Sequence, residues 1–224
     1  MDDARRRGGF DCVFVLGDTV GYGPQPDECV ERLREEVLVT VAGNHDLGVV
    51  GRVDLARFNP DAAAVCAWSR SRLSASSMRF LRALPLSHRE SPFLFVHGSP
   101  RDPVWEYVTS QPQAVTLAPF CEELHCIVGH THCQSAFSMD GASASGAGLW
   151  SAGQELVLRG RFVINPGSVG QPRDGDPRAA YAIYDSDDAA VSFRRVPYDV
   201  HGTADLMLSV GLPVLLARRL HAGY

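Results

Sequence analysis

Five short polar segments follow one another along this chain, and each of the first four comes directly after a run of apolar residues. Such a run predicts a buried strand, and the polar segment marks the point where that strand enters a loop. Because α/β folds build their sites at strand ends, we expect the segments to meet. They are Gly17-Asp18-Thr19-Val20-Gly21, Gly43-Asn44-His45-Asp46, Val96-His97-Gly98-Ser99-Pro100, Gly129-His130-Thr131-His132 and Asn165-Pro166-Gly167-Ser168-Val169-Gly170.

The side chains gathered in this way are one Asp, one Asn and three or four His. Glycines beside them allow the backbone and the side chains to approach a common centre closely. Together they make a mixed oxygen and nitrogen ligand set. Such a set suits first-row divalent transition metals better than magnesium or calcium, which prefer oxygen ligands. The sequence therefore predicts a transition-metal site.

The pattern also resembles a known family. A Gly-Asp-x-x-Gly segment, Gly-Asn-His-Asp, a His-Gly pair and Gly-His-Thr-His are similar to the motifs of the calcineurin-like metallophosphoesterases. The Gly21-Tyr22-Gly23-Pro24 segment resembles their small bacterial phosphodiesterase branch, and the resemblance runs from about Phe10 to the C-terminus. It implies one α+β domain over residues 1–224, built as a four-layer αββα sandwich of two mixed sheets.

The resemblance also implies two divalent metal ions. In the family they share a bridging Asp, which corresponds to Asp18. Asn44, His97 and His130 would complete the second metal site, and His132 would belong to the first. Manganese is the expected metal, and iron, zinc, nickel and cobalt tolerate the same ligands.

Two further residues receive a catalytic role from the resemblance. His45 would lie over the substrate phosphate, where it stabilises charge or protonates the leaving oxygen. Asp46 would orient the imidazole of His45. The reaction would be hydrolysis of a phosphodiester or a phosphomonoester by a water that two metal ions activate. Arg173 and Asp174 are further candidates for contact with the substrate.

One part of the family pattern is not found. Members open with a strand that ends in Asp-x-His and completes the first metal site, whereas no Asp-x-His precedes Asp18. Residues 1–11 instead resemble the end of a helix, with Arg5 to Arg7 in its last turn and Gly8-Gly9 as its stop. We therefore expect an N-terminally truncated domain that lacks its first strand, through a misplaced gene start, a partial gene or a natural truncation. The first metal site would then be incomplete.

The remaining pattern predicts helices first and short strands later. Pro26, Asn59 and Pro60 mark helix starts. The predicted helices span residues 27–36, 61–73, 77–84 and 110–123, and a tail after residue 201 that is broken near Gly211-Leu212-Pro213. The predicted later strands span residues 136–139, 155–158, 162–165, 180–184 and 191–196.

Composition excludes several classes of protein. No apolar stretch approaches the roughly 20 residues that cross a bilayer, and the N-terminus lacks a signal-peptide core, so we expect a cytoplasmic protein without membrane contact. The net charge of −5 argues against a general nucleic-acid binder and leaves nucleic acid only as a substrate. All 21 basic residues are arginine, which excludes a Walker A loop and Schiff-base chemistry because both need lysine.

Two classes of function remain open. The first is an active phosphohydrolase acting on a small phosphoester, with a phosphodiesterase ranked first because no Asp-Arg-Gly follows the first Gly-Asp. The second is a non-catalytic binding or scaffold protein that keeps the fold, or a fragment that is inactive because Asp-x-His is absent. The intact His45 and His97 favour the hydrolase, and the missing Asp-x-His favours the alternative.

Overall fold

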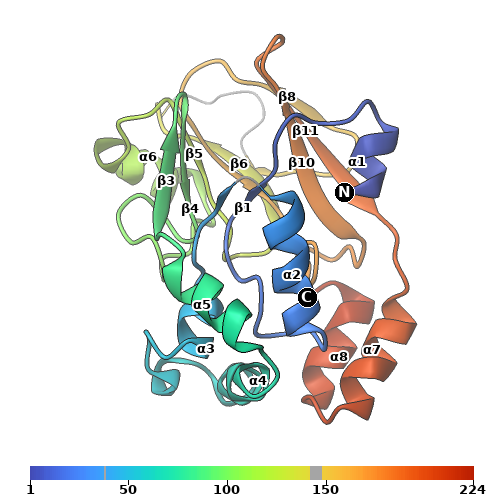
Figure 1. The fold of residues 1–224 in the computed structure, drawn as a ribbon. Coiled ribbons are helices and arrows are strands. Elements are labelled where there is room, and N and C mark those ends of the chain that lie inside the picture. The colour runs from blue at the N-terminus through green and yellow to red at the C-terminus, as the bar shows by residue number, and fades with distance from the viewer. Residues whose placement is uncertain (38, 142–147) are drawn as a thin grey trace.

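The computed structural model describes residues 1–37, 39–141 and 148–224, and Figure 1 shows the arrangement of its elements. The helices are α1 (Asp2–Arg6), α2 (Pro26–Glu36), α3 (Asn44–Val49), α4 (Pro60–Arg70), α5 (Ala75–Ala83), α6 (Gln111–Leu117), α7 (Val200–Ser209) and α8 (Val214–Ala222), with short 3-10 helices at η1 (Leu55–Arg57) and η2 (Ala118–Phe120). The strands are β1 (Phe14–Val15), β2 (Val39–Thr40), β3 (Ser87–Glu90), β4 (Phe93–Val96), β5 (His125–Ile127), β6 (Gln134–Ser138), β7 (Gly148–Leu149), β8 (Glu155–Val157), β9 (Phe162–Pro166), β10 (Ala179–Asp185) and β11 (Ala190–Val196).

The strands form a mixed set of sheets, which confirms the predicted α+β fold. Six strands lie in the order β3-β4-β5-β9-β6-β7, three in the order β10-β11-β8, and β1 pairs with β2. In the large sheet β4, β5 and β9 are parallel, while β3 and β6 are antiparallel to their neighbours. Hydrogen bonding therefore divides the described strands into three sheets rather than the two expected. The reason is that β1 and β2 are two residues long and bond only to each other, although the Phe14 ring stacks on Phe95 of β4 at 4.4 Å between ring centroids.

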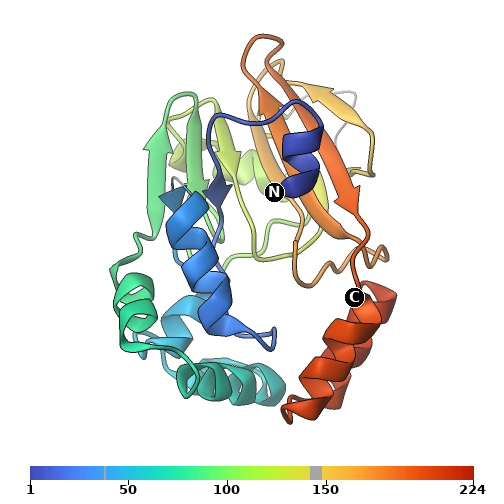
Figure 2. The ribbon, with the colours of Figure 1, turned by 45° about the vertical axis from the view of Figure 1, so that its right-hand side comes forward.

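The core lies between the sheets. Phe162 and Ile164 of β9 pack with Val191 and Phe193 of β11, so the six-stranded and three-stranded sheets meet face to face. At the opposite end of the molecule, Val65 of α4 packs into the apolar cluster that the α7–α8 hairpin forms. Figure 2 shows the α7–α8 hairpin next to α4.

Most predicted helices are confirmed at their starts. Helix α4 begins where its cap was expected, because the Asn59 side chain accepts a hydrogen bond from the Ala62 amide at 2.9 Å. Helix α6 ends at Leu117, well before the predicted residue 123. Pro119, which lacks an amide proton, falls within η2 and stops the helical ladder.

The N-terminal segment has the predicted helical form. Helix α1 is followed by Gly8 and Gly9, whose φ values of 124° and 87° turn the chain away. The Tyr181 hydroxyl of β10 donates to the Asp3 carboxylate at 2.7 Å and ties α1 to the three-stranded sheet. Within the described residues, no helix has both the length and the apolarity needed to cross a bilayer.

Candidate metal centre

The predicted ligands follow the carboxyl ends of neighbouring strands. Asp18 comes after β1, His97 directly after β4 and His130 after β5, while Asn44 opens α3 just beyond β2. Strands β1 and β2 are parallel, and so are β4 and β5. Each parallel pair brings two of the segments to one edge, and the 2.7 Å contact between the Leu16 carbonyl and Nδ1 of His97 joins the two pairs.

These side chains meet at short distances. Nε2 of His97 lies 3.1 Å from Oδ1 of Asn44, 3.0 Å from Nδ1 of His130 and 3.5 Å from Oδ2 of Asp18. One ligand atom from each of Asp18, His97 and His130 lies within 4.8 Å of the others. Nε2 of His132 lies 3.9 Å from the same Asp18 oxygen. Asp18 therefore lies within reach of both His97 and His132, and all five predicted ligands are brought together.

Backbone carbonyls fix the orientation of two of the imidazoles. Nδ1 of His97 is 2.7 Å from the Leu16 carbonyl, and Nδ1 of His132 is 2.8 Å from the Gln171 carbonyl. A carbonyl only accepts, so each Nδ1 carries the proton and each Nε2 turns a lone pair toward Asp18. Burial lowers the pKa of His130 to about 3 and lowers the pKa of His132 as well, so these rings are neutral at neutral pH.

Hydrogen bonds within this cluster do not satisfy all of its polar atoms. Oδ1 of Asn44, Oδ2 of Asp18 and Nε2 of His97 are all acceptors, yet they lie next to one another. Nε2 of His130 is buried without a hydrogen-bond partner among the described residues. The His45 amide donates to Oδ1 of Asp18 at 3.0 Å, and a hydrogen bond to a carboxylate favours its ionised form. An ionised carboxylate among nitrogen and amide lone pairs fits a divalent transition-metal ion.

The backbone is strained at three of the predicted ligands. Asp18, His130 and His132 have φ values of 52°, 60° and 61°, in the left-handed region that residues with a side chain seldom adopt. Within the described part of the chain, the one other non-glycine residue with a positive φ is Ala189. Strain of this kind costs free energy and gathers at functional sites, where it aims side chains at a common point.

Glycines let the two loops of the site touch. A Cβ on Gly43 would lie 2.1 Å from Oδ1 of Asp18, and a Cβ on Gly17 would lie 2.4 Å from the Gly43 nitrogen. No side chain fits at either position. The glycine before each ligand is therefore required by the close approach of the Asp18 and Asn44 loops.

The structure corrects the predicted role of Asp46. Its oxygens accept hydrogen bonds from the Gly43 amide at 2.9 Å and the Val20 amide at 3.2 Å, and it makes no hydrogen bond to the His45 ring. The reason is its place in the first turn of α3, from which the side chain folds back onto the amide that precedes the helix. Burial, together with nearby Asp18, raises the pKa of Asp46. Asp46 thus holds the two metal-site loops together.

His45 lies at the inner wall of the site. Its backbone amide donates to Oδ1 of Asp18 at 3.0 Å, and its ring packs against Tyr22 at 4.0 Å between centroids. Nδ1 of the ring is 3.3 Å from the sulfur of Cys66, a residue that no sequence motif marked. Burial lowers the pKa of His45 to about 4, so at neutral pH the ring is a neutral donor rather than an imidazolium ion.

Two other residues were not predicted as site residues. The Tyr107 ring stacks on His130 at 3.9 Å with an interplanar angle of 6°, which holds that ligand in place. Gln171 accepts from His132 through its carbonyl and from the Arg173 guanidinium through its side chain, at 2.8 Å in both cases. Arg173 itself lies over the Tyr22 ring, 5.3 Å from its centroid. Neither Tyr107 nor Gln171 lies within one of the five polar segments, so only the structure reveals their contacts.

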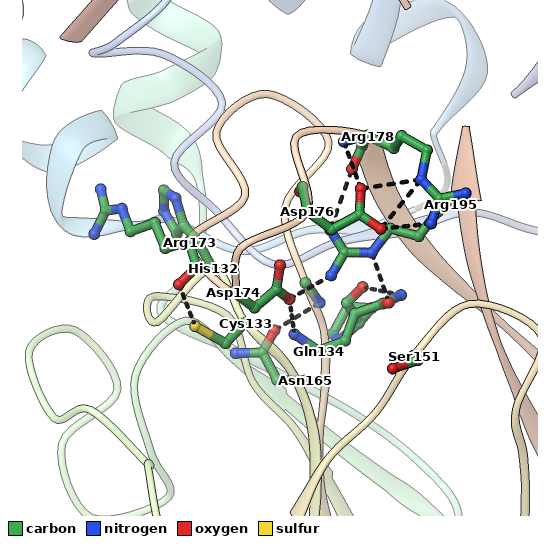
Figure 3. A network of polar contacts seen from close by, with 12 residues as sticks. His132, Cys133, Gln134, Ser151, Asn165, Arg173, Asp174, Asp176, Arg178 and Arg195 are labelled. Atoms are coloured by element: carbon green, nitrogen blue, oxygen red, sulfur yellow. Dashed lines mark hydrogen bonds and ion pairs between the residues drawn. The ribbon is translucent and has the colours of Figure 1, made fainter. Parts of the chain in front are cut away.

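A buried polar network supports the loop that carries His132, as Figure 3 shows. The Arg195 guanidinium pairs with the Asp174 carboxylate and donates to the Gln134 side chain at 2.9 Å. Asp174 in turn accepts from the Gln134 amide at 2.9 Å, at the start of β6. Asn165, from the fifth motif, donates to the Thr131 hydroxyl at 2.9 Å and braces the same loop. The Asp174 carboxylate is therefore bound by Arg195 and by the Gln134 backbone amide.

Comparison with known proteins shows the family and the fold of the chain. Residues 2–189 match the model of the calcineurin-like phosphoesterase superfamily domain. The chain is 35% identical to the uncharacterized protein MJ0912 of Methanocaldococcus jannaschii, covering 100% of this chain and 90% of that protein. It superimposes on a metallophosphoesterase from Sphaerobacter thermophilus with a TM-score of 0.89 and 40% identity, over 100% of this chain and 93% of the other. The hypothetical protein PH1004 from Pyrococcus horikoshii OT3 shares the fold, with a TM-score of 0.80 and 18% identity over 100% and 90% of the two chains. The chain therefore belongs to the calcineurin-like phosphoesterase superfamily.

Proposed function

We propose that the protein is a phosphodiesterase that hydrolyses a small phosphoester in the cytoplasm, using a water activated by two divalent transition-metal ions. Phosphomonoesters are a second substrate type for the same chemistry. The observation that supports this proposal best is the convergence of Asp18, Asn44, His97 and His130 from four separate segments onto one point.

The ligands divide unequally between two ions. Asp18, Asn44, His97 and His130 would hold one ion, and Asp18 with His132 would hold the other. Bound divalent ions supply Lewis acidity at such a site, lowering the pKa of a water toward about 7 and neutralising phosphoryl charge. Because four side chains serve one ion and two serve the other, we expect one ion per chain to bind more tightly.

The chain's other groups act on the substrate. His45 is neutral, and no described residue hydrogen-bonds its Nε2, which leaves that atom available to donate to a phosphoryl or leaving oxygen. Arg173, whose backbone amide donates to the His132 carbonyl, adds a fixed positive charge beside the site and is held over Tyr22 and by Gln171. In a chain without lysine, arginine and histidine carry the phosphate contacts.

The test is hydrolysis of bis(p-nitrophenyl) phosphate in the presence of Mn²⁺, together with metal content measured after gel filtration. We expect turnover by the wild type. His130→Ala should fall to background and lose one bound ion per chain, because it removes a ligand of the tighter site. His201→Ala is the matched control, since His201 is exposed on α7, and it should match the wild type in both measurements.

Two results would contradict the proposal. Full activity in the His130→Ala variant would show that the predicted centre is not used. A wild type that binds metal but hydrolyses neither bis(p-nitrophenyl) phosphate nor p-nitrophenyl phosphate would refute the enzyme assignment and favour a scaffold role.

A further inference from the structure

Cys66 is a buried group that the proposed reaction does not yet use. It lies on α4 and is fully buried, on the same face as Ala62 and Ser69, so the packing of α4 into the fold turns it inward. Its sulfur lies 3.3 Å from Nδ1 of His45, whose side chain is also buried. A thiol and a ring nitrogen at this distance form a hydrogen bond whose direction depends on which atom carries the proton.

The surroundings of Cys66 decide that direction. Cys66 belongs to the apolar core cluster that also contains Leu47, Val49 and Leu81, an environment that disfavours a thiolate. Burial raises the pKa of the Cys66 thiol to about 12, so the S–H proton is retained. Among the described residues, Nδ1 of His45 is the one hydrogen-bond partner within reach of this thiol, so the retained proton is donated to Nδ1 rather than left unpaired in the core. A neutral imidazole that accepts at Nδ1 carries its own proton on Nε2.

Packing places the His45 ring but does not choose its tautomer. Tyr22 lies against the ring, and Phe58 meets it edge-on at 5.2 Å between centroids. Gly21 closes the Nδ1 side so tightly that a Cβ there would lie 2.4 Å from Nδ1. None of these contacts distinguishes Nδ1–H from Nε2–H. Within the described residues, the Cys66 thiol is the one hydrogen-bonding partner of the His45 ring, because Asp46 is occupied by backbone amides.

We propose that Cys66 is a positioning residue: its thiol donates to Nδ1 of His45 and keeps the ring proton on Nε2, where it faces the substrate phosphoryl group. The substrate part of this inference rests on the proposed function, and the tautomer part does not. The proton stays on Nε2 as a hydrogen-bond donor, so no proton transfer is needed. Loss of the thiol would let Nδ1–H compete and would leave a fraction of the protein with a lone pair facing the phosphate.

The tautomer is measured first, by ¹⁵N-detected NMR of the histidine side chains in the zinc-loaded protein, because Zn²⁺ is diamagnetic. The His45 signals are assigned from their loss in His45→Ala. We expect a protonated Nε2 and an unprotonated Nδ1 in the wild type and in Cys66→Ser, which keeps a donor. In Cys66→Ala the two nitrogens should shift toward a mixture. A wild-type ring protonated on Nδ1, or a Cys66→Ala spectrum identical to the wild type, would overturn the inference.

Kinetics then separate positioning from packing. We expect Cys66→Ala to lower kcat for bis(p-nitrophenyl) phosphate by about 3- to 10-fold, the effect of losing one net hydrogen bond, while KM changes little. Cys66→Ser should recover most of that loss. Cys121→Ala, which removes another buried thiol far from His45 in sequence, should leave kcat unchanged.

A double-mutant cycle completes the test. If Cys66 acts through His45, Cys66→Ala should not lower kcat further in the His45→Ala background. An equal fold-loss in both backgrounds would show that the thiol acts by packing and would overturn the inference. If the wild type hydrolyses neither bis(p-nitrophenyl) phosphate nor p-nitrophenyl phosphate, the proposed function fails, and the tautomer measurement alone decides the role of Cys66.

Discussion

Gly43→Ala is the substitution that tests the geometry of the centre most directly. The added Cβ would lie 2.1 Å from Oδ1 and 2.3 Å from the backbone nitrogen of Asp18, whereas ordinary contact begins near 3.4 Å. The two loops must therefore separate by more than 1 Å. Gly43 has a φ of −90°, so alanine adds no backbone strain and the effect is purely steric. Because misplacing a catalytic group by about 1 Å can cost about 100-fold in rate, we expect a loss of that order, with overpacking costing about 1–3 kcal/mol of stability.

The assay compares kcat/KM for bis(p-nitrophenyl) phosphate, bound metal and urea unfolding in Gly43→Ala and in Gly23→Ala. Gly23 lies in the neighbouring loop and has nothing within 4 Å of an added Cβ, so it is the matched control and should resemble the wild type. A Gly43→Ala variant that keeps metal and retains kcat/KM within about threefold of the wild type would refute the reasoning. It would mean that the centre tolerates separation of the Asp18 and Asn44 loops.

Two further predictions concern stability. His125 is buried between phenylalanine rings, and burial lowers its pKa to about 4 from the usual 6.5. The unfolded chain takes up a proton between these pH values and the folded chain does not, so stability falls as the pH falls from 6.5 toward 4. The free energy of unfolding should fall by about 1–2 kcal/mol between pH 7 and pH 5 because of His125, and His125→Phe should remove this part of the fall. Urea unfolding at both pH values measures it, and an unchanged pH dependence in the variant would contradict the argument. Arg195→Met should cost about 3–5 kcal/mol, because it leaves the buried Asp174 unpaired. Arg178→Met, at an exposed ion pair, should cost about 1 kcal/mol or less, and equal losses in the two variants would contradict the burial argument.

The order of elements follows from local signals in the sequence. Proline and asparagine at helix starts and glycine at helix ends act within one or two turns, so they can be recognised without the fold. The α4 cap at Asn59 and the break between α7 and α8 are examples. The early end of α6 was also local, at Pro119, and was missed because the apolar pattern continues beyond it. Pairing of β1 and β2 with each other alone depends on distant segments and was not predicted.

In the candidate metal centre, too, some features follow from the sequence and others do not. Asp18, Asn44, His97, His130 and His132 each follow a strand, and parallel strand ends bring Asp18 close to Asn44 and His97 close to His130. The contact between these two strand pairs is tertiary. The supporting contacts do not follow from spacing. Asp46 was assigned to the ring next to it in sequence, but in the structure it binds backbone amides of two loops.

The sequence by itself determined the family and predicted the ligand set and the chemistry, because metal ligands and their glycines stand at fixed places within short segments. Only the tertiary structure decided which groups support those ligands and His45. Cys66 reaches His45 from α4, and Tyr107 covers His130 from a loop, across 21 and 23 positions of the chain. Such contacts arise when whole elements pack, and packing depends on the shape of the assembled core rather than on any local pattern.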